Sequence, residues 1–112
     1  MSVVIEELRK HWLCTTDENC IDIPLTDVNQ LNLLGEQPIH IAAWKCGSEE
    51  ILWLLGNGAN INSVGDFGMT PLHYAYMGRK PENVQVLLAA GATTTIRCER
   101  GLRPGEGYGI TY

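Results

Sequence analysis

The feature that most constrains the fold of this chain is a repeat of 33 residues. Glycines stand at positions 35, 68 and 101, and prolines stand at positions 38, 71 and 104. His40 pairs with His73 at the same distance, and Gly58 pairs with Gly91. A fixed period of this length is typical of a stack of short supersecondary units that bury their faces against one another. The sequence therefore predicts a repeat architecture, in a single domain over residues 1–112.

The composition is that of a globular protein, with 45% hydrophobic and 19% charged residues. No apolar run approaches the ~18 residues that cross a bilayer. The start of the chain carries Glu6 and Glu7 where a secretory signal has positive charge. These features predict a cytoplasmic protein without a membrane segment. The cysteines lack the close pairing of metal or dithiol motifs, which predicts reduced thiols and no metal site at Cys14, Cys20, Cys46 and Cys98.

The net charge of −5 is unevenly distributed. Residues 1–58 contain 9 acidic and 3 basic residues, a net of −6, whereas residues 59–112 contain 4 acidic and 5 basic residues, a net of +1. An acidic face repels phosphate, so the chain is not expected to bind nucleic acid directly. Such a face attracts a basic protein. The alternative is a solvated acidic surface without a partner.

The first 26 residues do not follow the period. Residues 3–13 are predicted to form a capping helix, because apolar side chains recur there at helical spacing. Residues 14–26 then form an acidic insertion, in which Pro24 disfavours helix. An irregular connector is one interpretation. A functional loop is the other, with candidate residues Asp17, Glu18 and Asp22.

Two regular units follow, over residues 27–61 and 62–94. In the first, Pro38 is predicted to begin a helix that runs to about 46, and Ser48 to cap a second helix that stops at Gly58. In the second unit, helices are predicted to begin at Pro71 and Pro81, and the second stops at Gly91. Residues 95–112 begin a third unit, but three glycines at positions 105–109 disfavour helix, so this segment is predicted to be a truncated cap.

The segment Thr70-Pro71-Leu72-His73-Tyr74-Ala75 closely resembles the ankyrin-repeat signature Thr-Pro-Leu-His-x-Ala, and Gln37-Pro38-Ile39-His40-Ile41-Ala42 is a looser copy. The segment 54–62 also resembles the ending of the ankyrin outer helix, Leu-Leu-x-x-Gly-Ala-Asp-Val-Asn. This resemblance implies an all-α ankyrin-repeat solenoid with hairpin loops. It contains two complete helix-turn-helix repeats, and terminal half-repeats or a dimer partner cover the ends. It further implies structural roles for Pro38, His40, Pro71 and His73.

Ankyrin-like folds bind partners through their hairpin tips and the exposed side of the inner helices. The 33-residue register places the corresponding partner-binding positions of this chain at Leu33, Leu34, Glu36, Trp44, Lys45, Asp66, Phe67, Met69, Met77, Glu99, Arg100 and Leu102. Large apolar side chains gathered on one concave face suggest a protein-binding patch. The alternative is that Leu34, Phe67 and Leu102 pack on neighbouring hairpins or caps.

Catalytic motifs are not evident in the sequence. His40 and His73 lack the accompanying nucleophile and orienting acid of a hydrolytic site. The glycine-rich stretch 101–109 lacks the Lys followed by Ser or Thr of a phosphate loop. We therefore expect neither catalytic residues nor a cofactor. An enzyme with an unfamiliar site in the acidic insertion is the remaining enzymatic alternative.

The leading functional hypothesis is a non-enzymatic inhibitor that occupies the surface of one partner. Small stand-alone ankyrin-like proteins include bacterial immunity proteins that neutralise a cognate toxin, often a basic nuclease, and an acidic chain suits such a target. The alternative is a scaffold or assembly subunit that forms a homodimer through the same apolar face.

Overall fold

The computed structural model describes residues 28–31 and 34–106. The predicted capping helix, the acidic insertion with Asp17, Glu18 and Asp22, and Leu33 lie outside these residues. The described residues form no strand. They form the 3₁₀ turn η1 (Asp66–Gly68) and the four α-helices α2 (Pro38–Lys45), α3 (Ser48–Gly56), α4 (Pro71–Met77) and α5 (Pro81–Ala89).

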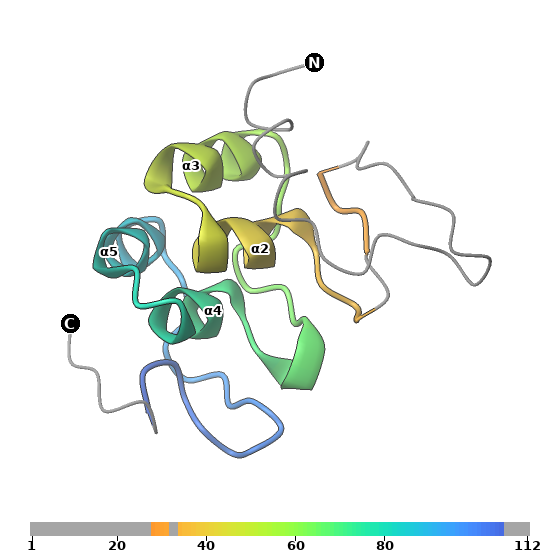
Figure 1. Ribbon diagram of the computed structural model, residues 1–112, viewed down its shortest axis with the longest axis vertical. Helices are drawn as coiled ribbons and strands as arrows, with labels where there is room; N and C mark the ends of the chain where they lie inside the picture. The colour runs from red at the N-terminus through yellow and green to blue at the C-terminus, as the bar shows by residue number, and fades with distance from the viewer. Residues whose placement is uncertain (1–27, 32–33, 107–112) are drawn as a thin grey trace.

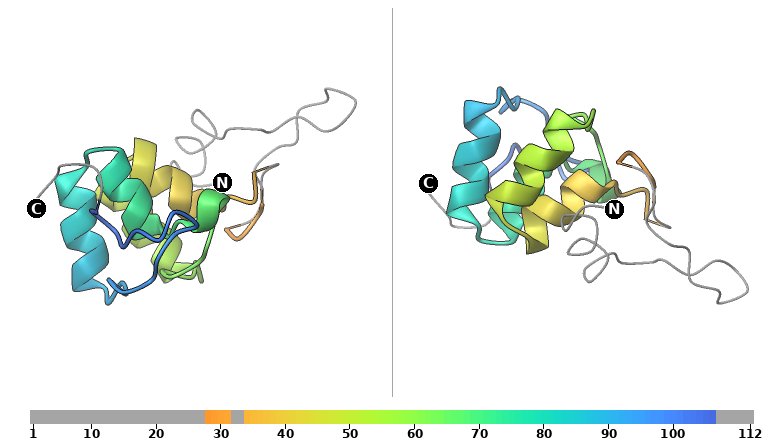
Figure 2. Two further views of the ribbon diagram at one scale, coloured as in Figure 1. Left: turned by 90° about the horizontal axis from the view of Figure 1, so that it is seen from below. Right: turned by 90° about the horizontal axis from the view of Figure 1, so that it is seen from above.

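The helices form two stacked pairs. The inner helices α2 and α4 pack against each other, and the outer helices α3 and α5 do the same (Figures 1 and 2). The hydrophobic core lies between these layers and includes Ile39, Ala43, Leu54, Leu72 and Leu87, which are all buried. The predicted all-α stack of helix-turn-helix units is therefore confirmed.

The helix boundaries follow from the residues that recur at the period. A proline occupies the first turn of α2, α4 and α5, where its fixed φ suits a helix and its missing N–H is not needed. Beyond the outer helices, Gly58 and Gly91 adopt nearly equal φ values of 98° and 96°. L side chains rarely tolerate this conformation, so glycine stops the outer helix in both units.

The predicted cap of α3 is wrong. Gly47 is the N-cap residue, and its N–H donates to Glu50 Oε1 at 3.0 Å. Ser48 Oγ instead donates to Asn83 Oδ1 at 3.2 Å. The buried Asn83 side chain also donates to the carbonyl oxygens of Ala43 and Cys46, at 3.1 and 2.9 Å. One amide of α5 therefore joins the second unit to the end of α2 and to the turn between α2 and α3.

Each buried histidine links its inner helix to the unit that follows. The N–H of Gln37 donates to His40 Nδ1 at 2.9 Å, so the ring proton lies on Nε2 and is donated to the Ser63 carbonyl at 2.9 Å. His73 repeats the arrangement. Its Nδ1 accepts from the N–H of Thr70 at 3.0 Å, and its Nε2 donates to the Leu102 carbonyl at 2.9 Å. Both rings are fully buried.

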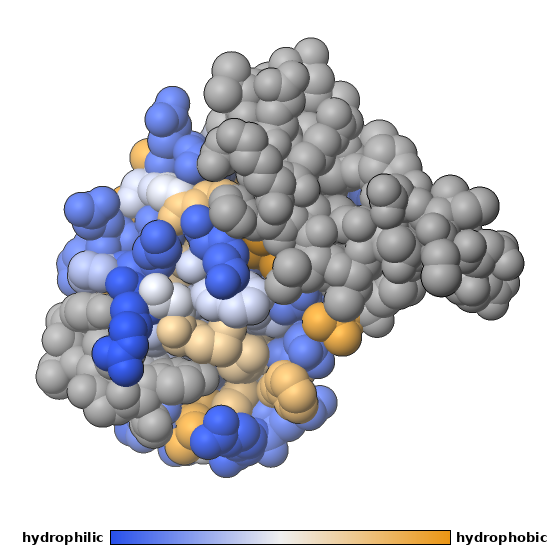
Figure 3. All heavy atoms as spheres, in the orientation of Figure 1, coloured by the Kyte–Doolittle hydropathy of each residue, from blue (hydrophilic) through white to orange (hydrophobic). Residues whose placement is uncertain are grey.

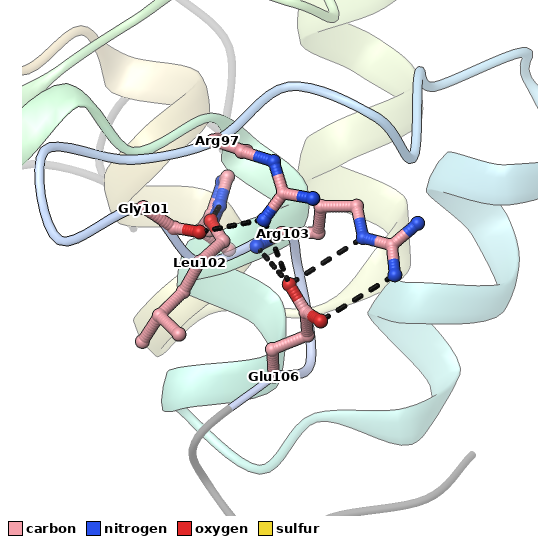
Figure 4. A network of polar contacts seen from close by, with 6 residues as sticks. Arg97, Gly101, Leu102, Arg103 and Glu106 are labelled. Atoms are coloured by element: carbon pink, nitrogen blue, oxygen red, sulfur yellow. Dashed lines mark hydrogen bonds and ion pairs between the residues drawn. The ribbon is translucent and has the colours of Figure 1, made fainter.

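The segment after α5 is held by polar contacts rather than by a helix. Arg97 Nη1 donates to the Gly101 carbonyl at 2.7 Å, and Glu106 Oε1 accepts from the N–H of Arg103 at 2.6 Å (Figure 4). Through residue 106 this segment contains turns and no helix. A short network of exposed polar contacts around Glu106 therefore positions the Leu102 carbonyl, which accepts the hydrogen bond from His73 Nε2.

The histidines predict how stability depends on pH. Burial lowers the pKa of both His40 and His73 below the usual 6.5. In the unfolded chain these rings take up protons near pH 6.5, before the folded protein does. Stability is therefore complete above this pH and falls as the pH decreases below it, by up to about 1.4 kcal/mol per pH unit for each ring.

We expect the free energy of unfolding, measured by urea denaturation at pH 7.5 and 5.5, to fall less in His40→Gln or His73→Gln than in the wild type. Equal decreases in the wild type and in both variants would contradict the assignment of neutral, buried rings.

Candidate functional site

Two adjoining clefts open on the side of the molecule formed by α2, α4 and the hairpin loops. The first, here called the acidic cleft, has a volume of about 210 Å³ and is lined by Leu34, Glu36, Trp44, Asp66, Phe67, Met69, Tyr74 and Met77. The second, the C-terminal cleft, has a volume of about 250 Å³ and is lined by Phe67, Met69, Met77, Cys98 and Arg100. Phe67, Met69 and Met77 belong to both clefts and form the wall between them. Figure 3 shows apolar atoms across the lower half of this face, bordered by hydrophilic side chains.

The structure brings most of the predicted partner-binding residues together in these clefts. Leu33 lies outside the described residues, and three of the described ones line neither cleft. Lys45 is exposed, and its Nζ lies 4.1 Å from the centroid of the Trp44 ring. Glu99 has an exposed side chain, and Leu102 is partly buried and packs against the hydrophobic core. The side chain of Leu102 therefore packs on its neighbours.

Exposure also differs from the prediction within the clefts. Phe67 and Leu34 are exposed, at 58% and 44% of their full surface. The expectation of exposure is wrong for Glu36 and Met69, which are only 3% and 8% exposed. These two positions stand 33 residues apart and lead into α2 and α4, so the repeat itself turns both side chains inward.

The buried Glu36 forms a direct contact between the two units. Tyr74 OH donates a hydrogen bond of 2.5 Å to Glu36 Oε2. Burial, and then this bond to a carboxylate, raise the pKa of Tyr74 far above its usual value, so the phenol stays protonated and serves as a donor. The Tyr74 ring lies 5.0 Å from His40 and 6.2 Å from Trp44, between ring centroids. The acidic cleft is thus lined by a fixed aromatic and carboxylate cluster.

Sequence reasoning did not name Tyr74 and Cys98 as part of the binding face. A usable signal was present for Tyr74, since it precedes Met77 by three residues on the same helix and so lies on the same side. A buried tyrosine also requires an acceptor for its hydroxyl. For Cys98 the sequence offers no comparable signal.

Phe67 is held in a conformation that is unfavourable for its residue type. Its φ is 55°, in the left-handed region, which costs an L residue about 1–2 kcal/mol. Local hydrogen bonds fix this geometry: the N–H of Phe67 donates to Asp66 Oδ1 at 3.0 Å, and its carbonyl accepts from the N–H of Glu99 at 2.8 Å. The hairpin therefore presents a large exposed aromatic ring at the boundary of the two clefts, a kind of strain that often marks a functional position.

The two clefts provide a surface on which another molecule can bind. No group of three or more His, Cys, Asp or Glu side chains is placed there to hold a metal ion. Its histidines are engaged in the bonds between units, and Cys46 and Cys98 are buried free thiols. Among the described helices, none combines the length and the hydropathy required to cross a membrane. The clefts can accommodate apolar or amphipathic side chains of another molecule without covalent chemistry.

Comparison with known proteins supports the repeat assignment. Residues 10–98 match the family described as "Ankyrin repeats (3 copies)". The chain is 31% identical over 103 residues to a protein of Rickettsia bellii (strain RML369-C) named for its ankyrin repeats, an alignment that covers 91% of this chain and 40% of that protein. It is 36% identical over 61 residues to Ankyrin repeat domain-containing protein 37 of Xenopus tropicalis, covering 53% of this chain and 36% of that protein. The chain therefore spans about two fifths of the length of these curated relatives.

Replacing Phe67 should separate strain from packing. Asparagine adopts left-handed φ at little cost, so Phe67→Asn should leave the free energy of unfolding unchanged or raise it by up to about 1 kcal/mol. The matched variant Met69→Asn introduces an amide at a buried position of the same wall and should lower it by about 2 kcal/mol or more. Thermal or urea denaturation measures both. Similar losses in the two variants would show that Phe67 is a packing residue.

Proposed function

Because the chain belongs to the ankyrin-repeat family, we propose that it is a non-enzymatic binding protein that inhibits one basic partner, such as a toxin domain, by occupying its surface. Ankyrin repeats generally mediate protein–protein interactions. The binding surface in this proposal consists of the acidic cleft and the C-terminal cleft, together with the hairpin tips beside them.

The observation that carries the proposal is the exposed Phe67 between the acidic cleft and the C-terminal cleft. Aromatic side chains that become buried at the centre of an interface supply much of its binding energy. The backbone of Phe67 has an unfavourable φ, and its ring is largely exposed in the isolated chain. A second molecule that covers the ring would complete its packing. Met69 and Met77 on either side provide adaptable apolar walls.

The basic character of the partner is inferred from charge. The chain carries −5 overall, and nine of its acidic residues fall in the first 58 positions. Asp66 lines the acidic cleft, and Glu99 occupies the equivalent position of the next hairpin, outside both clefts. Opposite charge accelerates encounter and orients docking, which suits an inhibitor that must bind before its target acts.

Affinity capture with matched variants tests this function. The wild-type chain should retain a basic protein from the host extract. Trp44→Ala and Phe67→Asp should each weaken that binding by about tenfold or more, because each removes a central aromatic anchor. Leu52→Asp is the control, since Leu52 on α3 is 56% exposed, nearly as much as Phe67, yet lines neither cleft. A retained partner that tolerates Phe67→Asp but is lost with Leu52→Asp would place the binding surface elsewhere.

Light scattering separates the inhibitor from a self-assembling scaffold. The inhibitor proposal predicts a monomer at micromolar concentration, with the cleft face available to a different protein. A stable homodimer that Phe67→Asp dissociates would instead favour the scaffold, because the same face would then bind a second copy of the chain.

A further inference from the structure

We propose that the C-terminal cleft receives an aromatic side chain of the partner, and that Arg100 pairs with a carboxylate of the partner residue beside it. This inference rests on the proposed function and specifies what one of its two clefts recognises. The occupant is a short segment of the partner in which an aromatic residue stands next to an aspartate or a glutamate.

The C-terminal cleft is a small apolar recess with several sulfur atoms in its lining. Met69 and Cys98 are only 8% and 7% exposed, so they form its deepest part. Phe67 is exposed and Met77 is half-buried, and both also line the cleft. Thioether sulfurs make favourable contacts with aromatic rings. The lining therefore favours an aromatic side chain as the occupant.

The volume of this cleft suits one side chain of a protein segment. It measures about 250 Å³, below the ~300–1,000 Å³ of sites that enclose a small-molecule ligand. An apolar cavity of ~150 Å³ already holds a benzene ring. One aromatic side chain therefore fits in the cleft, and the residues next to it in the partner must lie outside, where Arg100 is exposed.

Arg100 supplies the charge that selects the residue beside the aromatic one. Arg97 and Arg103 of the same segment both lie near the carboxylate of Glu106 (Figure 4). Within the described part of the chain, no carboxylate pairs with Arg100. Among the described residues that line the cleft there is no carboxylate either, so the lining does not repel an anion. The planar guanidinium group of Arg100 is therefore available to a carboxylate of the partner.

Backbone hydrogen bonds fix the position of Arg100 beside the cleft. The N–H of Gly101 donates to the Cys98 carbonyl at 2.8 Å, which closes the turn that carries Arg100. The N–H of Glu99 donates to the Phe67 carbonyl at 2.8 Å, which joins this turn to the hairpin that carries the aromatic ring. The charge and the apolar recess are thus held together before a partner binds, so little ordering of the backbone is required on binding.

A partner that is basic overall can meet this requirement. The net charges of two proteins govern their encounter over long distances, whereas the pairing at one cleft depends on the few residues that meet there. The inference therefore requires one acidic residue at the point of contact, and it sets no condition on the total charge of the partner.

Titration with capped dipeptides tests this inference on the full chain. The probes are N-acetyl-Phe-Glu-amide and N-acetyl-Glu-Phe-amide, their glutamine counterparts, and N-acetyl-Ala-Glu-amide. At low ionic strength, at least one probe with both Phe and Glu should shift the methyl resonances of Met69 and Met77 saturably, with a Kd in the millimolar range. Its glutamine counterpart should bind about two- to fivefold more weakly. The alanine probe should bind about tenfold more weakly or worse, because it lacks the ring.

A matched pair of variants locates the charge. Arg100→Gln should abolish the difference between the glutamate probe and its glutamine counterpart. Arg79→Gln is the control, since Arg79 is also exposed but lies between α4 and α5 and lines neither cleft. This variant should keep the difference. The indole N–H of Trp44, which lines the acidic cleft and not the C-terminal cleft, should keep its resonance.

Four results would each overturn the inference. They are the absence of a saturable shift with both glutamate probes, equal binding of the glutamine or alanine probes, equal effects of Arg79→Gln and Arg100→Gln, and a saturable shift at Trp44 in place of the methionine methyl groups.

Failure here can be told apart from failure of the proposed function. If a captured partner depends on Phe67 but neither glutamate probe binds, the binding function stands and only the occupant of the C-terminal cleft is lost. If the probes bind and captured proteins ignore Phe67, the cleft recognises an aromatic and acidic pair but the proposed interface is wrong.

Discussion

The buried imidazole of each inner helix donates a hydrogen bond to the unit that follows, and the stack depends on this bond. A single helix pair cannot bury its own apolar face, so it must be fixed against its neighbour. His40 reaches Ser63 and His73 reaches Leu102, in both cases through Nε2. The two acceptors are not equivalent positions of the repeat, which shows that the donor recurs while its acceptor depends on the local loop.

Other polar contacts add directly to this connection. Asn83 bonds two carbonyls at the end of α2, and Tyr74 bonds the buried Glu36. Buried polar groups of this kind cost free energy unless they are paired, and their pairing is possible in only one alignment of the two units. The framework is therefore set by buried polar residues, whereas the exposed side chain of Phe67 takes no part in these bonds.

The fold could be predicted from the sequence because prolines and glycines act locally. They fix φ or allow positive φ wherever they stand, so helix starts and stops follow from them at a constant spacing. The burial of Glu36 could not be predicted in this way. It depends on a hydroxyl 38 residues further along the chain, whereas a glutamate is ordinarily exposed. The columns of the repeat identified most of the cleft lining, because stacked units place equivalent residues side by side. Only the tertiary structure shows that Phe67 separates two clefts.

The central claim is that a partner docks on the face that carries the clefts. Photo-cross-linking in the host cell tests it most directly, with Phe67→benzoylphenylalanine on that face and Leu52→benzoylphenylalanine on the outer helix at nearly the same exposure. Both probes react with whatever protein lies within a few ångströms, whether or not the partner is known beforehand. The account predicts one basic protein joined through position 67 and none through position 52. Cross-links from position 52 alone would contradict it.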